Sequence, residues 1–341
     1  MKAIVYETCG SPDVLRCEEI EKPRVREQHV LIKVRAAAVN PLELGELKGI
    51  PYLARMLFGL RQPERAHPAR LGLDVAGEVE AVGSKVTRFQ PKDAVFGVCI
   101  SDPHASGARV WVHEQGAFAE YACVPESALA IKPENVTFEQ AAAAGIAGLT
   151  ALQGLRDRGR IQAGYRVLVN GAAGGVGTFA VQIAKAFGAE VTGVCRTSNV
   201  VMLRSIGADH VLDYTQVDFT RGGEKYDLIF DCVSNHSLTE YRRVLRPKGV
   251  LVMAGDQTGR GALGIVGRLT GALLSSKLTS QTFVTFIAKP KWEDLSALQD
   301  LMQAGKVKPV IDKCYSLNQV ADAIRYLEQK HARGKVVITV A

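Results

Sequence analysis

The pattern of hydrophobic and polar positions changes near residue 125. Before that point, short apolar or alternating runs are separated at short intervals by glycine, proline and aspartate. Runs of this kind predict β-strands joined by turns. We therefore expect a compact, β-barrel-like first domain. Its predicted strands include 2–7, 29–39, 74–83, 94–99 and 117–125.

From about residue 137, long helical patterns alternate with strands that are apolar throughout. Segment 138–155 is rich in small residues and predicts a helix, and 165–170 predicts the first strand after it. Strands that are apolar on both faces and separated by helices require a parallel sheet with helices on both sides. Further strands are expected at 190–195, 210–214, 226–233 and 249–255, and helices at 175–189, 199–208 and 237–245.

The junction between the first of these strands and the next helix concentrates glycine. Gly171, Gly174, Gly175 and Gly177 stand between "VLVN" and a long apolar helix pattern. Glycine allows positive φ and lets the backbone approach a ligand closely. The helix N-terminus that follows offers free N–H groups and a positive dipole end to a pyrophosphate. This strand–turn–helix context predicts a dinucleotide site.

The end of the second strand of this sheet indicates which dinucleotide binds. NAD-binding sheets place an acidic residue there to hold the ribose 2′-hydroxyl, but this strand ends in "GVCRTSN" with Arg196 and Ser198. A guanidinium suits a 2′-phosphate. Tyr214, which closes the third strand, is expected nearby. The sequence therefore favours NADPH, although Arg196 could also be a solvated surface charge.

Composition and charge narrow the class of protein further. With 341 residues, 23% charged and 47% hydrophobic, the chain is typical of a soluble protein of two domains. The net charge of +7 is scattered, without the basic and aromatic runs of nucleic-acid binders. Seven widely spaced cysteines without a C-x-x-C pair indicate reduced thiols and a cytoplasmic location. No apolar stretch is long enough to span a membrane.

Several of these segments together resemble the medium-chain dehydrogenase/reductase superfamily. They are "GAAGGVG" at 171–177, "GVCRTSN" at 193–199, "GADHVLDY" at 207–214 and the ending "HARGKVVITV" at 331–340. "AAVNPLELGELKG" at 37–49 and "LGLDVAGEVEAVGS" at 71–84 are most similar to its zinc-free quinone oxidoreductase branch, particularly to the reticulon-interacting mitochondrial oxidoreductases.

The resemblance implies an α/β chain of two domains. A GroES-like catalytic domain would comprise 1–125 and 290–341. A Rossmann domain with a doubly wound parallel sheet would cover 126–289 and bind NADP, and the active site would lie in the cleft between the domains. Homodimerisation is expected from the habit of the family.

The resemblance also bears on zinc. Asn40 stands where the zinc enzymes of the superfamily have a cysteine, and Gly72-Leu73-Asp74 replaces their Gly-His-Glu. A catalytic zinc needs three protein ligands and an open position, and neither Asn40 nor Leu73 supplies one. His67, His104 and His113 have no partner cysteine at metal-binding spacing. We therefore expect no metal.

Without a Lewis acid, acceptors that are already electron-poor become favoured, namely quinones and α,β-unsaturated carbonyls. By resemblance, Asn40 and Thr150 lie near the nicotinamide, although the Thr150 hydroxyl could instead bond back to its own helix. Tyr52 is a candidate proton donor, with an apolar lid residue as the alternative. The remaining cofactor contacts expected are Ala173, Gly174, Gly175, Val176, Val233, Arg333 and Lys335, the last two facing the NADPH phosphates unless 331–335 is a plain surface loop.

Two longer segments are left over. Residues 55–71 mix apolar and basic side chains and are typical of a lid or binding loop. Residues 262–289 are apolar and weakly amphipathic, which fits a wall of the substrate pocket and dimer contact, or else a patch in peripheral contact with a membrane.

The function expected is therefore an NADPH:quinone oxidoreductase or enone reductase. A 2-enoyl thioester reductase is the alternative enzyme, favoured if the basic residues of 55–70 bind the phosphates of its substrate. A non-catalytic NADPH-binding redox reporter or partner-binding protein is the alternative outside enzymes.

Overall fold

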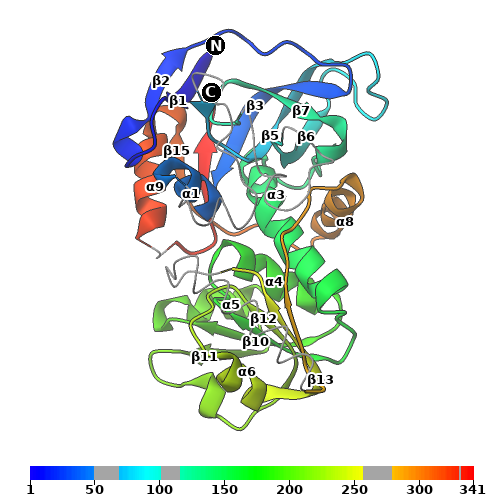
Figure 1. The fold of residues 1–341 in the computed structure, drawn as a ribbon. Coiled ribbons are helices and arrows are strands. Elements are labelled where there is room, and N and C mark those ends of the chain that lie inside the picture. The colour runs from blue at the N-terminus through cyan, green and yellow to red at the C-terminus, as the bar shows by residue number, and fades with distance from the viewer. Residues whose placement is uncertain (50–68, 101–115, 256–278, 330–331) are drawn as a thin grey trace. The chain divides into compact units, whose positions relative to one another are not determined.

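The computed structural model describes residues 1–49, 69–100, 116–255, 279–329 and 332–341 (Figure 1). The chain forms two compact units. The first comprises Met1–Leu149, Lys289–Ala304 and Pro309–Ala341, and the second comprises Thr150–Ala288 and Gly305–Lys308.

These limits differ from the boundary at residues 125 and 126 that the change of pattern indicates. The division falls inside helix α3 (Phe138–Gln153), because the first turns of this helix pack on strands of the first unit. Gly305–Lys308, inside the expected 290–341 part, belong to the second unit, where the Lys308 N–H donates to Gln182 Oε1 at 2.8 Å.

The first unit is built from two sheets, as the short runs at the start of the chain predict. A three-stranded sheet has the order β2-β1-β4. A seven-stranded sheet has the order β15-β16-β3-β5-β6-β8, with β7 paired to β3. The bounds are β1 Lys2–Tyr6, β2 Arg16–Glu19, β3 His29–Val39, β4 Ala69–Arg70, β5 Asp74–Val82, β6 Ala94–Val98, β7 Tyr121–Pro125, β8 Leu129–Ile131, β15 Ile311–Ser316 and β16 Lys335–Thr339.

Strand β3 is the centre of this unit, since it pairs with β16, β5 and β7. Most of its residues are buried, which fits a strand covered on both faces. Helices α1 (Pro41–Lys48), α8 (Trp292–Gln303) and α9 (Val320–Glu328) pack around the sheets (Figure 1). Helix α9 buries Val320, Ala323 and Ile324, the spacing of an amphipathic helix with one apolar face.

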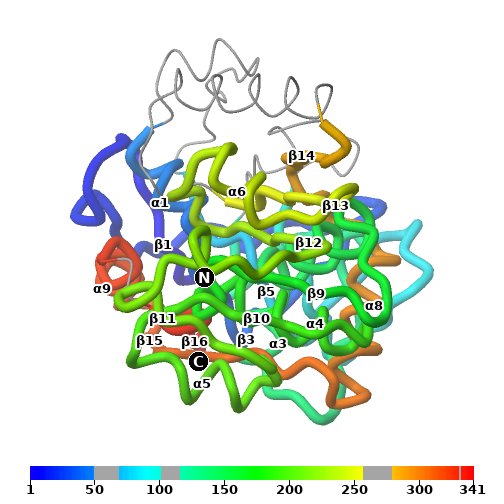
Figure 2. Tube along the Cα trace, turned by 90° about the horizontal axis from the view of Figure 1, so that it is seen from below, coloured from blue at the N-terminus to red at the C-terminus, as the bar shows by residue number. Residues whose placement is uncertain are grey.

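The second unit contains the parallel sheet that the alternating helices and strands predict. Its six strands have the order β11-β10-β9-β12-β13-β14, and Figure 2 shows them in this order. The strand bounds are β9 Arg166–Asn170, β10 Glu190–Cys195, β11 His210–Asp213, β12 Tyr226–Asp231, β13 Leu245–Met253 and β14 Thr282–Thr285. The helices α4 (Gly175–Ala186), α5 (Val200–Ser205) and α6 (Leu238–Val244) connect them.

Part of the apolar segment 262–289, which was expected to form a pocket wall and dimer contact or a membrane patch, is strand β14 of this sheet. Residues 282–285 pair in parallel with β13 and form the last strand on that side of the sheet. Phe283 is buried, whereas its neighbours on the opposite face, Thr282 and Val284, are exposed and half-buried, as expected of a strand with one face on the core. Residues 262–278 lie outside the described residues. No helix in the described ranges has the length and apolar character needed to cross a membrane.

Candidate cofactor and active site

The glycine turn has the geometry that a phosphate site requires. Strand β9 ends at Asn170, and helix α4 begins at Gly175 with Gly174 as its N-cap. Gly171 has φ +79°, and a Cβ on Gly177 would lie 2.2 Å from the Gly171 carbonyl oxygen. A Cβ on Gly174 would meet nothing closer than 3.5 Å. Gly171 and Gly177 therefore let the turn fold, while Gly174 leaves open space in front of the helix N-terminus.

The loop after β12 closes against the same turn. A Cβ on Gly171 would lie 2.6 Å from Val233, so the structure brings Val233 beside the glycine turn as expected. Ala173 is buried within the turn, and Gly174, Gly175 and Val176 are half-buried. The predicted pyrophosphate contacts therefore form one continuous backbone surface at the carboxyl ends of β9 and β12.

A buried polar network that sequence reasoning missed fixes these two strand ends. Asn170 and Asp231 are register partners on β9 and β12, and Asn170 Nδ2 donates to Asp231 Oδ1 at 2.9 Å. The same oxygen accepts the N–H groups of Val233 at 3.1 Å and Ser234 at 2.9 Å. Asn170 also donates to the Tyr241 hydroxyl at 3.2 Å. The sequence shows only that each residue ends an apolar strand, whereas the adjacency of β9 and β12, which brings the two together, comes from the sheet order.

The residues predicted to read the 2′-phosphate lie together at the carboxyl ends of β10 and β11. Cys195 and Asp213 are register partners, so Arg196 and Tyr214 follow at neighbouring positions, and the Tyr214 N–H donates to the Cys195 carbonyl at 3.0 Å. Arg196 and Ser198 are exposed, and Tyr214 is 54% exposed. The Arg196 guanidinium forms no ion pair with any residue that the structure describes. Among the described residues, therefore, an unpaired cation stands where an NAD-binding sheet would carry an acid.

In the first unit, Asn40 belongs to a buried cluster with Glu43, Asp74 and Lys335. Asn40 Oδ1 accepts from Lys335 Nζ at 2.5 Å, and its Nδ2 donates to Asp74 Oδ2 at 3.1 Å and to the Ala38 carbonyl at 3.2 Å. Lys335 Nζ also reaches Asp74 Oδ2 at 2.9 Å. Within this cluster, therefore, both sides of the Asn40 amide are already occupied by protein groups.

Glu43 completes the cluster through the first turn of α1. Its carboxylate accepts the Asn40 N–H at 2.5 Å and the Leu73 N–H at 2.9 Å, the first being half of a capping box. The pKa of Glu43 is raised to about 7, chiefly by complete burial and also by the negative charge of Asp74. The N–H groups of Leu73 and Asn40 and the charge of Lys335 act in the opposite direction. The pattern Asn40-x-x-Glu43 could have predicted the cap, but only the fold brings it to Asp74.

The position of Lys335 differs from what the resemblance implies, whereas that of Arg333 leaves its predicted role open to test. Lys335 is 4% exposed, and its ammonium is held by Asp74 and Asn40. A buried ammonium needs a buried counter-charge, so Lys335 serves the cluster and is not an outward-facing phosphate ligand. Arg333 is exposed, with its Nε 3.7 Å from Asp312. Its contact with the NADPH phosphates stays a prediction.

Thr150 lies on α3, one turn after a residue that touches the cluster. Asp74 Oδ1 accepts the Ile146 N–H at 2.7 Å. Thr150 is half-buried, and no hydrogen bond of its hydroxyl is formed within the described residues. The bond back to its own helix, considered as an alternative above, is therefore not part of the described structure.

Other candidates lie outside the described residues. Tyr52, His67, His104 and His113 are among them, as is the segment 55–68. Over the ranges that are described, no group of three or more histidine, cysteine, aspartate or glutamate side chains could hold a metal ion.

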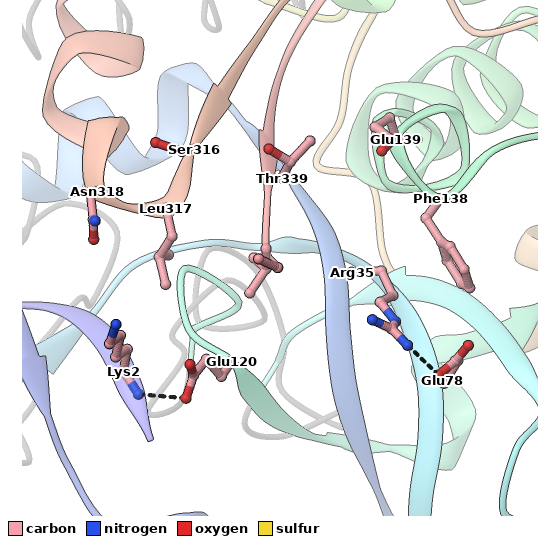
Figure 3. Close-up of a pocket in the computed structure, with 12 residues that line it drawn as sticks. Lys2, Arg35, Glu78, Glu120, Phe138, Glu139, Ser316, Leu317, Asn318 and Thr339 are labelled. Carbon is pink, nitrogen blue, oxygen red and sulfur yellow. Dashed lines mark hydrogen bonds and ion pairs between the residues drawn. The ribbon is translucent and has the colours of Figure 1, made fainter.

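A separate hollow of about 560 Å³ lies in the first unit (Figure 3). Among its lining residues, Arg35 pairs with Glu78 at 2.9 Å, and the backbone N–H of Lys2 donates to Glu120 at 2.7 Å. None of the predicted site residues lines it, so it is distinct from the candidate site.

Comparisons with known proteins agree with this geometry. Residues 26–134 match the alcohol dehydrogenase GroES-like domain, and residues 206–338 match the zinc-binding dehydrogenase family. The "NADPH-dependent alkenal/one oxidoreductase, chloroplastic" of Arabidopsis thaliana is 36% identical over 343 residues, covering 99% of this chain and 79% of that protein. The "NAD(P)H oxidoreductase RTN4IP1, mitochondrial" of Bos taurus is 32% identical over 371 residues, covering 100% of this chain and 89% of that protein.

Among solved structures, the quinone oxidoreductase from Coxiella burnetii is similar over 100% of this chain and 99% of its own, with a TM-score of 0.82 and 29% identity. The expected fold class, a GroES-like domain with a Rossmann-like parallel sheet, is confirmed. The full-length similarity to these relatives shows that the chain belongs to the medium-chain dehydrogenase/reductase superfamily.

Proposed function

We propose that the protein is an NADPH-dependent oxidoreductase that transfers hydride, without zinc, to quinones or α,β-unsaturated carbonyls. The observation that carries this proposal is the exposed Arg196 guanidinium, which has no ion-pair partner among the described residues and stands at the carboxyl end of β10 beside Ser198 and Tyr214. A guanidinium there can hold a 2′-phosphate by charge-assisted hydrogen bonds.

The remaining cofactor contacts follow from the second unit. The N–H groups of Gly175 and Val176 at the start of α4 would hold the pyrophosphate. Gly174, whose own N–H donates to the Gly171 carbonyl at 3.1 Å, would leave room for it. Val233, fixed by the N–H bond to Asp231, would line the site beside the turn. The Asn170–Asp231 network keeps both strand ends in place, so little ordering is required when the cofactor binds.

The acceptor class rests on the relatives, whose names include an alkenal/one oxidoreductase and a quinone oxidoreductase. When bound, NADPH supplies a hydride. With an enone, that hydride and a proton from solvent would together reduce the carbon–carbon double bond. With a quinone, one hydride and one proton give the hydroquinone. We propose that Thr150 contacts the nicotinamide and that Asn40 shapes the site through its cluster.

The zinc-free part of the proposal is supported by the buried charge next to Asn40. The Lys335 ammonium bonds both Asn40 Oδ1 and Asp74 Oδ2, so a cation already occupies the polar groups of this cluster. A divalent ion beside it would be repelled. The seven cysteines form no disulfide in the part of the chain that the structure describes, in keeping with the cytoplasmic location that we propose.

Stopped-flow oxidation of NADPH tests the function. We expect turnover with 1,4-benzoquinone and with a conjugated enal, unchanged by a chelator, in protein whose zinc content is well below one per chain. Faster turnover with crotonyl-CoA would favour the enoyl thioester reductase instead. Tight NADPH binding without turnover on any acceptor would favour the redox reporter, and loss of activity with the chelator would overturn the zinc-free assignment.

A further inference from the structure

The buried cluster of Asn40, Glu43, Asp74 and Lys335 also contacts helix α3, through Asp74. Asp74 divides its two carboxylate oxygens between two tasks. Oδ2 accepts from Lys335 and Asn40, whereas Oδ1 accepts the backbone N–H of Ile146 at 2.7 Å. Asp74 is completely buried, so no water competes for these bonds.

The hydrogen bond from the Ile146 N–H to Asp74 Oδ1 lies in the middle of a helix. Ile146 lies well inside α3, where a backbone N–H ordinarily belongs to the carbonyl four residues earlier. A carboxylate at 2.7 Å competes with that carbonyl, and hydrogen bonds to an ionised acceptor are the stronger ones. The carboxylate is therefore an anchor that fixes this turn of α3.

The neighbouring residue makes room for the anchor. A Cβ on Gly145 would lie 2.3 Å from Asp74 Oδ1 and 3.0 Å from the Gly97 carbonyl oxygen. Any larger residue at 145 would push Asp74 away from the helix. Gly145 and Asp74 thus fit each other, although they are far apart in sequence.

Thr150 lies one turn further along the same helix. Residues four apart share a helix face, so whatever fixes the N–H of Ile146 also fixes the place of Thr150. We propose that Asp74, held by Lys335, is a positioning residue that sets the place of Thr150 through helix α3. This inference rests on the proposed function, in which Thr150 contacts the nicotinamide.

The charge state of the cluster requires matched variants. Removing Asp74 alone would leave the Lys335 ammonium buried without its partner, which is strongly destabilising. The double variant D74N/K335M is neutral and keeps an oxygen for the Ile146 N–H. D74A/K335M is also neutral but has no acceptor. The difference between these two variants isolates the anchoring bond.

The first measurement does not depend on turnover. Hydrogen exchange of the peptide that contains Ile146 is expected to be faster in D74A/K335M than in D74N/K335M, while peptides of the second-unit sheet stay unchanged. Equal exchange in the two variants would overturn the proposal whether or not the protein turns over NADPH.

The second measurement asks whether the anchor acts through Thr150. Hydride transfer, followed with NADPH deuterated at the transferred position, is expected to be about tenfold to 100-fold slower in D74A/K335M than in D74N/K335M, with similar NADPH affinity. In a T150A background this ratio should fall towards one. D227N, which removes the negative charge from the half-buried Arg246–Asp227 pair, controls for general destabilisation.

The outcomes separate the two proposals. If none of the acceptors tested supports NADPH oxidation by the wild-type protein, the proposed function is refuted. If the wild-type protein turns over, the proposed function stands. If the ratio of hydride-transfer rates between D74N/K335M and D74A/K335M is then the same with Thr150 as with alanine at position 150, the positioning role of Asp74 is refuted.

Discussion

At the scale of single residues, two basic side chains predicted to bind the cofactor differ in their surroundings. Arg196 is exposed and free of an ion pair among the described residues, whereas Lys335 is buried and bonded to Asp74. The first cation is available to a ligand and the second is not. A sequence shows only that both are basic residues near predicted cofactor motifs.

Replacing Arg196 by alanine should weaken NADPH binding about tenfold to 100-fold, since a charge-assisted hydrogen bond contributes roughly 1.5–3 kcal/mol. NADH lacks the 2′-phosphate, so its affinity should change less than about twofold. Fluorescence titration with both cofactors measures the two dissociation constants. Arg221→Ala is the control, because its side chain is 79% exposed and pairs only with Asp218 among the described residues. Equal losses for NADPH and NADH would contradict the assignment.

Glu43 should make the stability of the protein depend on pH. Its pKa rises from 4.5 to about 7 on folding, so the folded state holds the proton more tightly than the unfolded chain. The resulting stabilisation is complete below about pH 4.5 and is lost as the pH rises to about 7. The loss is at most about 3.4 kcal/mol, from 1.36 kcal/mol for each pKa unit.

Chemical denaturation across this range measures the dependence, and Glu43→Gln should flatten it. If the free energy of unfolding has the same pH dependence in the wild type and in Glu43→Gln between about pH 4.5 and about pH 7, the raised pKa of Glu43 is contradicted.

At the scale of elements, the glycine turn combines two requirements in one short segment. Gly177 must lack a side chain so that α4 can pack on the turn, and Gly174 must lack one so that a phosphate can approach. Both requirements are local, so the strand–turn–helix pattern alone was sufficient to predict them. The neighbouring Asn170–Asp231 network was missed, because it depends on which strands are adjacent.

The two glycines can be told apart by substitution. Gly177→Ala should lower the free energy of unfolding by about 1–3 kcal/mol, because the added Cβ would lie 2.2 Å from the Gly171 carbonyl oxygen. Gly174→Ala has open space and φ −80°, so its stability should change by less than about 0.5 kcal/mol. Its NADPH affinity should nevertheless fall about tenfold, since the Cβ faces the approaching phosphate.

Thermal denaturation measures the stability of the two variants, and NADPH titration measures their affinity for the cofactor. If Gly174→Ala bound NADPH as well as the wild type, the pyrophosphate would not lie on this turn.

At the scale of the whole molecule, the sheet of the second unit ends in a strand with no neighbour on its outer side among the described residues. Strand β14 carries Phe283 towards the core and Thr282 on the opposite, exposed face. An open edge is a place where a second chain can add a strand. This edge supports the homodimer that family habit leads us to propose.

Light scattering should therefore give about twice the chain mass of 36.8 kDa. Val284→Pro, which cannot continue a strand ladder as donor, should shift the protein towards monomer while NADPH binding persists. Wild-type protein at the mass of a single chain would refute the dimer, and an unchanged mass in the variant would move the interface away from β14.

Much of this protein was readable from its sequence alone. The parallel sheet, the glycine turn and Arg196 in place of an acid follow from periodicity and from residues close together in the chain, where local geometry decides the outcome. Only the tertiary structure decided the place of Lys335, the division inside α3 and the cluster of Asn40, Glu43, Asp74 and Lys335. Lys335 and Asn40 are 295 positions apart and meet because β16 pairs with β3. Which buried charge faces which partner depends on this strand register, and no short stretch of sequence contains it.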